Sequence, residues 1–448
     1  MKTDKYRRLL SCCPSLLDAA DKTANDKNGA LQNNVPAQVT AYVTAPVLFC
    51  YVCYILDSVK KNNINRIFFL SRDGYILKQI ADIIIERKKL KIQTSYLYVS
   101  RYSLRNALYY KCETAEDFEN AGLFTGYTLK SAKNFLKRAG LNDCRRAEVY
   151  KEIGFSDDEN KDLGDSEYSA FCEKIKNDPA LLCKIKNNSE NNYHNIMKYF
   201  EQSGLFEKGK IAVVDSGWMG TVQKTLTALV NGRTDENIIG YYFGLYRRED
   251  DNYKAFLFDV TDAYKYVPTF CNNLFECFCS APHGMTTGYR KCNGKIIPVL
   301  SDANAEMVKM AEIQTKTAVR FTEYACKNEN YIPICKMRDI SAGLLKALMY
   351  KPDKQEAEIL GAFPFSDDVT EEKIQRLAGN CKGSISNILL PVRIIRKKKG
   401  KSIYPDKYIY WLYGSIVLTG CKPAWVYRLS VREWERLRLL RERRKLCR

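Results

Sequence analysis

The sequence has few histidines and lacks a long apolar run. It contains two histidines, His194 and His283, and no cysteine or histidine cluster at the spacing of a zinc site. The longest apolar stretch, residues 41–56, is shorter than the ~18–20 residues that cross a bilayer, and it contains Pro46. The N-terminal residues carry no apolar segment typical of a signal peptide. We therefore expect a cytoplasmic protein without a transmembrane helix.

The composition is otherwise that of a folded protein. The apolar fraction is 46% and the charged fraction 27%, which excludes disorder or coiled coil as a description of the whole chain. The 17 cysteines include Cys50 and Cys53, but this pair lies in an apolar segment without a second pair nearby, so we expect packed, reduced thiols. A length of 448 residues exceeds one compact core and suggests two or three lobes.

Positive charge is in excess and is unevenly placed. The net charge is +19, and residues 391–448 hold 17 basic residues against 4 acidic ones. This segment ends in an Arg-rich sequence with a helical pattern and includes Trp425 and Trp434, which favours docking to an anionic membrane surface. The alternatives are a solvated terminal helix or a contact with nucleic acid. No recognition-helix module or zinc finger is present, so we expect no nucleic-acid partner.

Two segments follow the order strand, loop, helix that builds parallel sheets. Residues 67–70 are continuously apolar, as in a strand buried on both faces, and the turn 71–74 leads into apolar positions at helical spacing from 76 to 84. Residues 210–230 repeat this pattern. The expected strands are residues 67–70, 96–101, 210–215 and 238–246.

This pattern predicts an α/β fold with a parallel sheet flanked by helices, a helical insertion lobe and a helical, basic C-terminus. The expected segments are an N-terminal lead-in (1–38), the first half of the α/β core (39–114), the helical insertion lobe (115–205), the second half of the core (206–300), a helical region (301–390) and a basic amphipathic tail (391–448).

The loop between the predicted strand 210–215 and its helix has the features of an anion site. Asp215 ends the strand, Gly217 and Gly220 allow a tight turn, and Thr221 opens the helix. Backbone N–H groups at a helix N-terminus attract phosphate, and a threonine there can donate to a phosphate oxygen. The alternative is a plain strand-to-helix turn whose glycines serve packing.

Ser71, Arg72, Asp73 and Gly74 form a second loop of the same topology. Its arginine can bind phosphate through two N–H groups at once. The alternative is an ion pair between Arg72 and Asp73 at a helix start. Two such loops in one α/β unit suggest a ligand that carries phosphate at two separated places.

The two loops resemble those of a known family. VVDSGWMGTVQKTL (213–226) is similar to the ribose-5-phosphate loop of type I phosphoribosyltransferases, and IFFLSRDGYILKQIA (67–81) is similar to their pyrophosphate loop. Together with YLYVSR, YYFGLY and SAPHGMTTGY, they resemble a module of bacterial polysaccharide-assembly clusters that is often fused to a HAD-type phosphatase domain. The resemblance runs from about residue 39 to residue 300.

The resemblance implies a phosphoribosyltransferase-like sheet and a Mg²⁺-dependent pentosyltransferase. Such an enzyme would move 5-phosphoribose from phosphoribosyl pyrophosphate to a lipid-linked glycan, a step toward ribofuranose in O-antigen or capsule. A separate phosphatase would then remove the 5-phosphate. The enzyme would be peripheral at the inner face of the cell membrane, with residues 391–448 on the anionic surface.

The resemblance also implies a role for each loop. Asp215 would bind the ribose hydroxyls as positive charge builds at C1. The groups that would hold pyrophosphate are Ser71, Arg72, Gly74 and Arg101. The groups that would hold the 5-phosphate are Ser216, Gly217, Gly220 and Thr221. No side chain is assigned as a direct metal ligand.

Two positions depart from the family pattern. Ser216 stands where a second acidic residue is usual, which weakens two-carboxylate binding of ribose, and Asp73 replaces a usual glycine. A general base would deprotonate the acceptor hydroxyl; the candidates are Asp73, Glu276 and His283. For His283 the alternative is a turn residue, and for Glu276 it is a solvated or N–H-bonded carboxylate.

Two other functions stay open. One is a HAD-associated sugar-phosphate hydrolase, and the other is a non-catalytic module that binds a phosphorylated ligand or scaffolds polysaccharide assembly. HAD chemistry needs a nucleophilic Asp with a second Asp two residues later, whereas Asp215 is followed at that spacing by Gly217. We therefore expect no HAD phosphatase in this chain.

Overall fold

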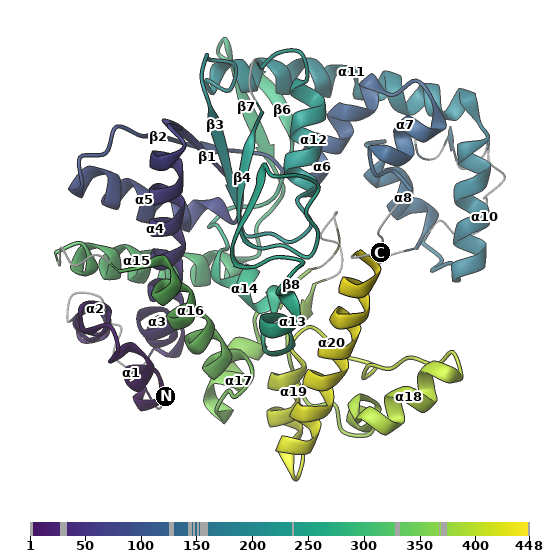
Figure 1. The fold of residues 1–448 in the computed structure, drawn as a ribbon. Coiled ribbons are helices and arrows are strands. Elements are labelled where there is room, and N and C mark those ends of the chain that lie inside the picture. The colour runs from purple at the N-terminus through teal and green to yellow at the C-terminus, as the bar shows by residue number, and fades with distance from the viewer. Residues whose placement is uncertain are drawn as a thin grey trace.

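The computed structural model describes residues 3–26, 34–124, 130–141, 146, 148–149, 152, 160–234, 237–327, 332–366, 368 and 374–446. Five parallel strands form one sheet in the order β2-β1-β3-β4-β5, with helices on both faces (Figure 1). This confirms the predicted α/β fold class and agrees with a phosphoribosyltransferase-like sheet. The strands are β1 (Arg66–Leu70), β2 (Gln93–Leu97), β3 (Ile211–Asp215), β4 (Ile239–Gly244) and β5 (Tyr253–Phe258).

Successive residues of each strand point to opposite layers of helices. In β1, Ile67 and Phe69 pack into one apolar cluster, and Phe68 and Leu70 pack into another on the other side. Because helices cover both faces, the strand reads as a continuous apolar run. The first face is covered by α4 (Ala45–Lys61) and α5 (Gly74–Arg87), and the second by α6 (Arg101–Leu108), α11 (Pro179–Gln202) and α12 (Thr221–Val230).

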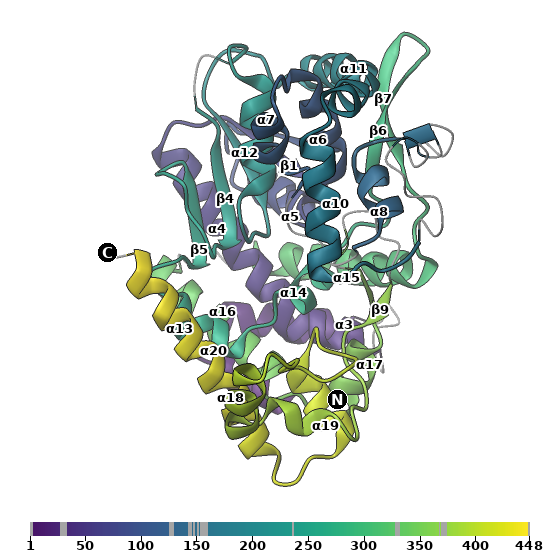
Figure 2. The same ribbon diagram turned by 90° about the vertical axis from the view of Figure 1, so that its right-hand side faces the viewer.

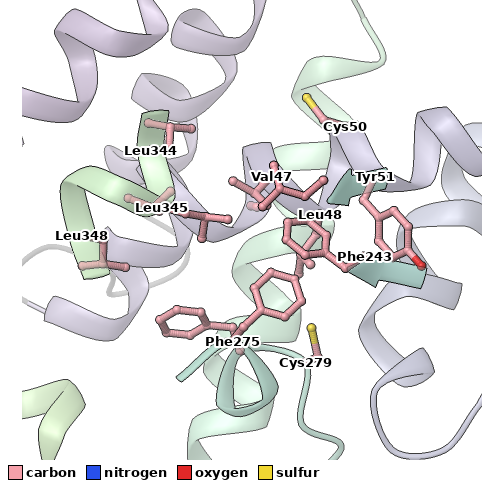
Figure 3. Close-up of a cluster of buried hydrophobic side chains, with 14 of the residues drawn as sticks. Val47, Leu48, Cys50, Tyr51, Phe243, Phe275, Cys279, Leu344, Leu345 and Leu348 are labelled. Carbon is pink, nitrogen blue, oxygen red and sulfur yellow. The ribbon is translucent and has the colours of Figure 1, made fainter. Parts of the chain in front are cut away.

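Helix α4 lies at the centre of the core. Figure 3 shows Val47 and Leu48 of α4 in one cluster with Leu345 of α16 (Ile334–Met349) and the ring of Phe243. With α3 (Val35–Val39) and η2 (Thr40–Thr44), α4 makes a continuous helical stretch, Val35–Lys61.

This stretch corrects one expectation from the sequence. Among the described residues, Val35–Lys61 alone is long and apolar enough to cross a membrane, and 89% of its apolar part is buried inside the fold. The sequence pattern placed the longest apolar stretch at residues 41–56, which is too short to cross a membrane and contains Pro46. The helix continues through Pro46 because proline is tolerated in a first helical turn, and here it follows the π-helical turn η2. Burial on all sides accounts for the apolar composition.

The first residues belong to the core, in contrast to the lead-in expected over residues 1–38. Helices α1 (Asp4–Leu10) and α2 (Pro14–Ala24) pack on α16 and α15 (Ala305–Ala325), respectively. Tyr6 is fully buried, and its hydroxyl donates a 2.6 Å hydrogen bond to Glu356. The sequence here is polar overall because only one side of each short helix is buried.

The helices after α6 form a separate lobe. α7 (Ala115–Asn120), α8 (Ala132–Arg138), α10 (Asp165–Lys176) and the first turns of α11 enclose their own apolar cluster, which includes Phe135 and Phe171. In Figures 1 and 2 this lobe lies at the N-terminal end of α11, on the opposite side of the sheet from α4 and α5. Parts of residues 115–205, the range expected to hold the insertion, lie outside the described residues.

Five strands were absent from the sequence-based expectation. Two of them are the short strands β8 (Pro364–Phe365) and β9 (Gln375–Arg376). The others are β5 and a hairpin of β6 (Thr286–Cys292) and β7 (Lys295–Leu300), which packs against α11. The hairpin turn is Asn293–Gly294, and both residues have positive φ. An Asn-Gly pair is the sequence signal of such a turn and could have revealed the hairpin. A strand was also expected over 96–101, but β2 ends at Leu97 and Arg101 begins α6.

The basic C-terminal segment is folded into the protein. Trp411 and Arg393 are fully buried, and α20 packs along η4 (Val267–Thr269) and α13 (Ala263–Tyr266). The basic segment expected over 391–448 is helical, as predicted, and its helices pack as a layer against the rest of the protein (Figure 2). The remaining elements are η3 (Tyr109–Lys111), α14 (Asn272–Phe278), α17 (Lys354–Gly361), η5 (Ile385–Ile388), α18 (Leu390–Lys398) and α19 (Leu412–Thr419), and α20 spans Ala424–Leu446.

Candidate active site

The two predicted loops open into one cleft. Strands β1 and β3 are neighbours in the sheet, and the chain turns to opposite sides after them, toward β2 and β4. Ligands of parallel sheets bind at such a switch point, beyond the carboxyl ends of the strands. A cleft of about 650 Å³ lies there. Its lining includes Ser71, Arg72, Asp73, Arg101, Asp215, Gly217, Thr221, Glu276 and His283.

Three of the predicted residues do not line the cleft. Ser216 is buried beneath it. At Gly74 a side chain would meet the backbone of Phe69 at 2.7 Å, so this glycine allows close packing of helix on strand. Gly220 has a φ of +64° and lies against the ring of Tyr253, so its role in the structure is the turn into α12.

Ser216 joins the two loops. Its hydroxyl donates a hydrogen bond to Asp73, and its backbone N–H donates to Asp215 Oδ1 at 2.9 Å. The hydroxyl of Tyr51, on α4, donates to the backbone carbonyl of Asp215 at 2.8 Å. The core helix thereby supports the end of β3, and the serine orients both carboxylates.

Burial and neighbouring charges shift the pKa of both aspartates. Burial raises the pKa of Asp215 well above its ordinary value, and the negative charges of Asp73 and Glu276 raise it further. Burial also raises the pKa of Asp73, against the opposing effects of the Ser216 hydrogen bond and the positive charges of Arg72 and Arg101. The cleft therefore retains a proton to a higher pH than isolated carboxyl groups would.

Helix N-termini surround these carboxylates with positive potential. α5, α6 and α12 all begin at the cleft, next to Asp73, Arg101 and Thr221. No side-chain hydrogen bond caps the start of α12, which leaves its first N–H groups without a capping acceptor, and Thr221 and Val222 line the cleft. Together with Arg72 and Arg101, these termini make the cleft suitable for phosphate groups.

Ser71 has a structural role. Its hydroxyl donates to the carbonyl of Val99 at 2.6 Å and accepts from the N–H of Val99 at 3.0 Å. These bonds attach the first loop to the segment after β2. Each of the two loops also contains a cis peptide bond, Ser71–Arg72 and Gly217–Trp218.

Glu276 lines the cleft from α14 and is bonded to a tryptophan. The Nε1–H of Trp218 donates to Glu276 Oε1 at 2.6 Å. The indole ring stacks on Phe258, with 6.2 Å between ring centroids. Glu276 is thus the N–H-bonded carboxylate of the alternative interpretation, placed at the cleft.

His283 has both ring nitrogens engaged. Because a carbonyl oxygen can only accept, Nδ1 donates to Gly284 O at 2.8 Å, and Nε2 then accepts from the hydroxyl of Tyr96 at 2.8 Å. Burial lowers the pKa of His283. This arrangement matches a neutral residue that orders the turn, although its ring lines the cleft.

Several lining residues were not predicted. Trp218 lay within the loop motif as a large aromatic residue, which is a signal for a specific contact. Lys137, Asn272 and Asn304 come from distant elements, and their sequence context shows no pattern that marks them. Within the described residues there is no cluster of three or more His, Cys, Asp or Glu side chains able to hold a metal ion.

The cysteines do not form a metal or disulfide site among the described residues, where all fifteen are free thiols. Burial raises the pKa of Cys50 and Cys53 on α4, and that of Cys53 is about 12. A buried, protonated thiol is a poor metal ligand and a poor nucleophile. This pair therefore contributes to packing.

No family model matches this chain. A search of curated proteins likewise found no significant match. The functional conclusion therefore rests on the geometry of the cleft and on the resemblance of its two loops.

Proposed function

We propose that the protein transfers 5-phosphoribose from phosphoribosyl pyrophosphate to a hydroxyl group of a lipid-linked bacterial glycan. The observation that carries the proposal is the meeting of the loops after β1 and β3 in one cleft, with an arginine on one loop and an open helix N-terminus on the other. A donor with phosphate at both ends of a pentose matches this arrangement. The volume of about 650 Å³ is in the usual range of small-molecule sites.

Each end of the donor has a matching part of the cleft. The N-terminus of α12 and the hydroxyl of Thr221 bind the 5-phosphate. The guanidinium groups of Arg72 and Arg101 bind the pyrophosphate. Asp215, at the end of β3, contacts the ribose hydroxyls.

The transfer breaks the bond from C1 to pyrophosphate and forms a bond from C1 to the acceptor oxygen. The carboxylate of Asp215 stabilises the positive charge that develops on the sugar. Asp73 or Glu276 accepts the proton of the acceptor hydroxyl. Asp73 and Asp215 are also the carboxylates able to hold Mg²⁺ with substrate oxygens, and that ion would neutralise charge on the leaving group.

The product keeps its 5-phosphate, so a separate phosphatase is required to leave ribofuranose. A lipid-linked acceptor places the reaction at the inner face of the cell membrane. We assign the basic layer over residues 391–448 to the contact with that anionic surface.

One observation favours a second candidate, a sugar-phosphate hydrolase. Asp73 and Asp215 share a cleft but have unlike surroundings. Burial raises the pKa of Asp215 well above its ordinary value, as suits an acid. For Asp73 the Ser216 hydrogen bond and the charges of Arg72 and Arg101 oppose the rise in pKa, as suits a nucleophile. Incubation of the protein with phosphoribosyl pyrophosphate, Mg²⁺ and a synthetic lipid-linked glycan distinguishes a transferase from a hydrolase. Acceptor-dependent release of pyrophosphate supports transfer, and release of inorganic phosphate without acceptor supports hydrolysis.

Variants and binding measurements complete the test. The combined variant Asp215→Asn, Arg72→Ala should lose turnover, and retained turnover would rule out this site. Tight binding of the donor by calorimetry without turnover on any acceptor would identify a non-catalytic phosphate-binding module instead.

A further inference from the structure

Arg393, on α18, is a buried cation without a hydrogen-bond partner. Its side chain is fully buried, and within the described part of the chain none of its three guanidinium nitrogens has an acceptor. Burial of an unpaired charge is unfavourable, and native proteins pair almost all such groups. Burial lowers the pKa of Arg393, and the negative charge of Glu435 opposes this from a distance without a hydrogen bond. The partner that would satisfy the guanidinium N–H groups is an anion.

Two aromatic rings hold this guanidinium in place. Its Cζ lies 5.2 Å from the centroid of the Tyr404 ring and 5.4 Å from that of Trp434. Ring faces stabilise the positive charge, but they leave its five N–H donors without full hydrogen bonds. The rings therefore hold a charged, oriented donor group beneath them, where it is covered.

Tyr404 and Trp434 also line a groove between α18 and α20. The groove has a volume of about 320 Å³ and shares no lining residue with the active-site cleft. Its apolar lining includes Ile394 and Leu437, and Lys397 and Arg441 add positive charge. Glu442 also lines the groove, but it pairs with Arg438 at 2.8 Å, so Lys397 and Arg441 leave the lining with a positive excess beside its apolar surface.

The surface around the groove has the same character. Large apolar side chains are exposed here, with Ile394 at 45%, Ile395 at 54% and Leu437 at 46%. Basic residues outnumber acidic ones by 17 to 4 over residues 391–448. Exposed apolar side chains beside excess positive charge are complementary to an anionic lipid.

We propose that the α18–α20 groove binds one anionic phospholipid of the membrane surface. The phosphate pairs with Arg393, Lys397 and Arg441, and the acyl chain lies on Ile394 and Leu437. Tyr404 belongs to the irregular segment between α18 and α19, and rotation of its ring exposes the guanidinium to the phosphate. The inference does not depend on the transfer reaction, because the groove and the cleft are separate.

The test uses the full-length protein and co-sedimentation with vesicles. Vesicles of phosphatidylcholine alone are compared with vesicles that also contain phosphatidylglycerol. The variant Arg393→Met should bind the phosphatidylglycerol vesicles about tenfold more weakly than wild type. The matched control Arg444→Met removes one exposed charge from α20 outside the groove and should stay within about twofold, as expected for a surface charge.

Equal losses in the two variants would overturn the proposal, because they would show general attraction by net charge. Thermal unfolding checks that Arg393→Met is folded. Leu437→Asp, at a half-exposed position, is a second variant that should lose vesicle binding by placing a carboxylate against the acyl chain. Unchanged vesicle binding by Leu437→Asp would likewise overturn the proposal.

A last measurement, of the unfolding temperature, distinguishes binding of a lipid from binding of a free phosphate. Short-chain phosphatidylglycerol should raise the unfolding temperature of the wild type, and glycerol phosphate at the same concentration should not. An equal rise with glycerol phosphate would overturn the lipid assignment. Turnover of Arg393→Met with a soluble acceptor should equal that of wild type, so failure here and failure of the proposed transferase are distinguishable.

Discussion

Ser216 donates its hydroxyl hydrogen to Asp73 and thereby joins the loop after β3 to the loop after β1, 143 residues apart in sequence. This hydrogen bond joins the two residues that depart from the family pattern, Ser216 and Asp73. An acidic residue at position 216 would face Asp73 with a second negative charge in a buried place. Serine at 216 and aspartate at 73 together keep an acidic group in the cleft, supplied from the other loop.

Removal of this hydroxyl should weaken both stability and turnover. Ser216→Ala leaves a buried oxygen of Asp73 without its partner, which costs about 1–3 kcal/mol of unfolding free energy. The hydrogen bond opposes the raised pKa of Asp73, so its loss moves the acid limb of the rate profile to higher pH. Ser203→Ala, which removes a 2.7 Å bond to Tyr199 O outside the cleft, is the control and should leave the profile unchanged.

Asp215→Asn should raise stability while it abolishes turnover. The pKa of Asp215 in the folded protein lies above its value of ~3.9 in the unfolded chain, so its contribution to stability falls as pH rises from about 4 toward the folded pKa. Asparagine has no such titration. The gain in unfolding temperature should therefore be larger at pH 7 than at pH 4.

Calorimetric or fluorescence melts at both pH values measure that gain. Asp18→Asn removes a half-exposed carboxyl on α2, which pairs with Lys22 at 2.7 Å, and controls for the loss of one charge. A variant Asp215→Asn that melts below the wild type at pH 7 would contradict the burial argument.

Trp218→Phe tests the position of Glu276. Phenylalanine keeps the stacking on Phe258 but loses the 2.6 Å N–H bond to the carboxylate. We expect a fall of about tenfold or more in kcat with little change in KM for the donor, because a general base typically contributes 10²–10⁴-fold. Trp411→Phe is matched, since it removes an indole N–H bond to Met349 O outside the cleft. It should lower the unfolding temperature and leave kcat unchanged.

Arg101→Ala should weaken donor binding without preventing folding. Arg101 is exposed and lines the cleft at the start of α6, so its loss removes a charge-assisted contact of about 1.5–3 kcal/mol with phosphate. KM for phosphoribosyl pyrophosphate should rise about tenfold or more, and less steeply at high salt, where screening already weakens the contact. Arg87→Ala, at the far end of α5, should leave KM unchanged.

Local patterns predicted much of the fold. The apolar run 67–70 and the run before Asp215 became β1 and β3, and the helical spacing after each loop became α5 and α12. These elements were recognisable because a strand covered on both faces is apolar throughout. β5 and the β6–β7 hairpin were not predicted, and α1 and α2 had no clear pattern because each buries a narrow face.

The residues of the candidate site, like the fold, were predicted only in part. Asp73 and Asp215 were recognisable because each ends a strand unit next to glycine and a helix start. Trp218 lay in the loop motif but was not predicted, and Lys137 reaches the same cleft from a position whose local sequence shows no pattern that marks it. His283 stood out by its rarity, but the bonds to Tyr96 and Gly284 engage both ring nitrogens.

The sequence alone determined the class of the fold, the two loops that end its central strands and the location of the excess positive charge. Each depends on neighbours along the chain, where apolar period and turn chemistry act directly. Only the tertiary structure decided that the loops share one cleft, that Ser216 bonds to Asp73, and that Arg393 is buried between two rings. These relations join residues far apart in the chain, so they follow from strand order and helix packing, which no local pattern encodes.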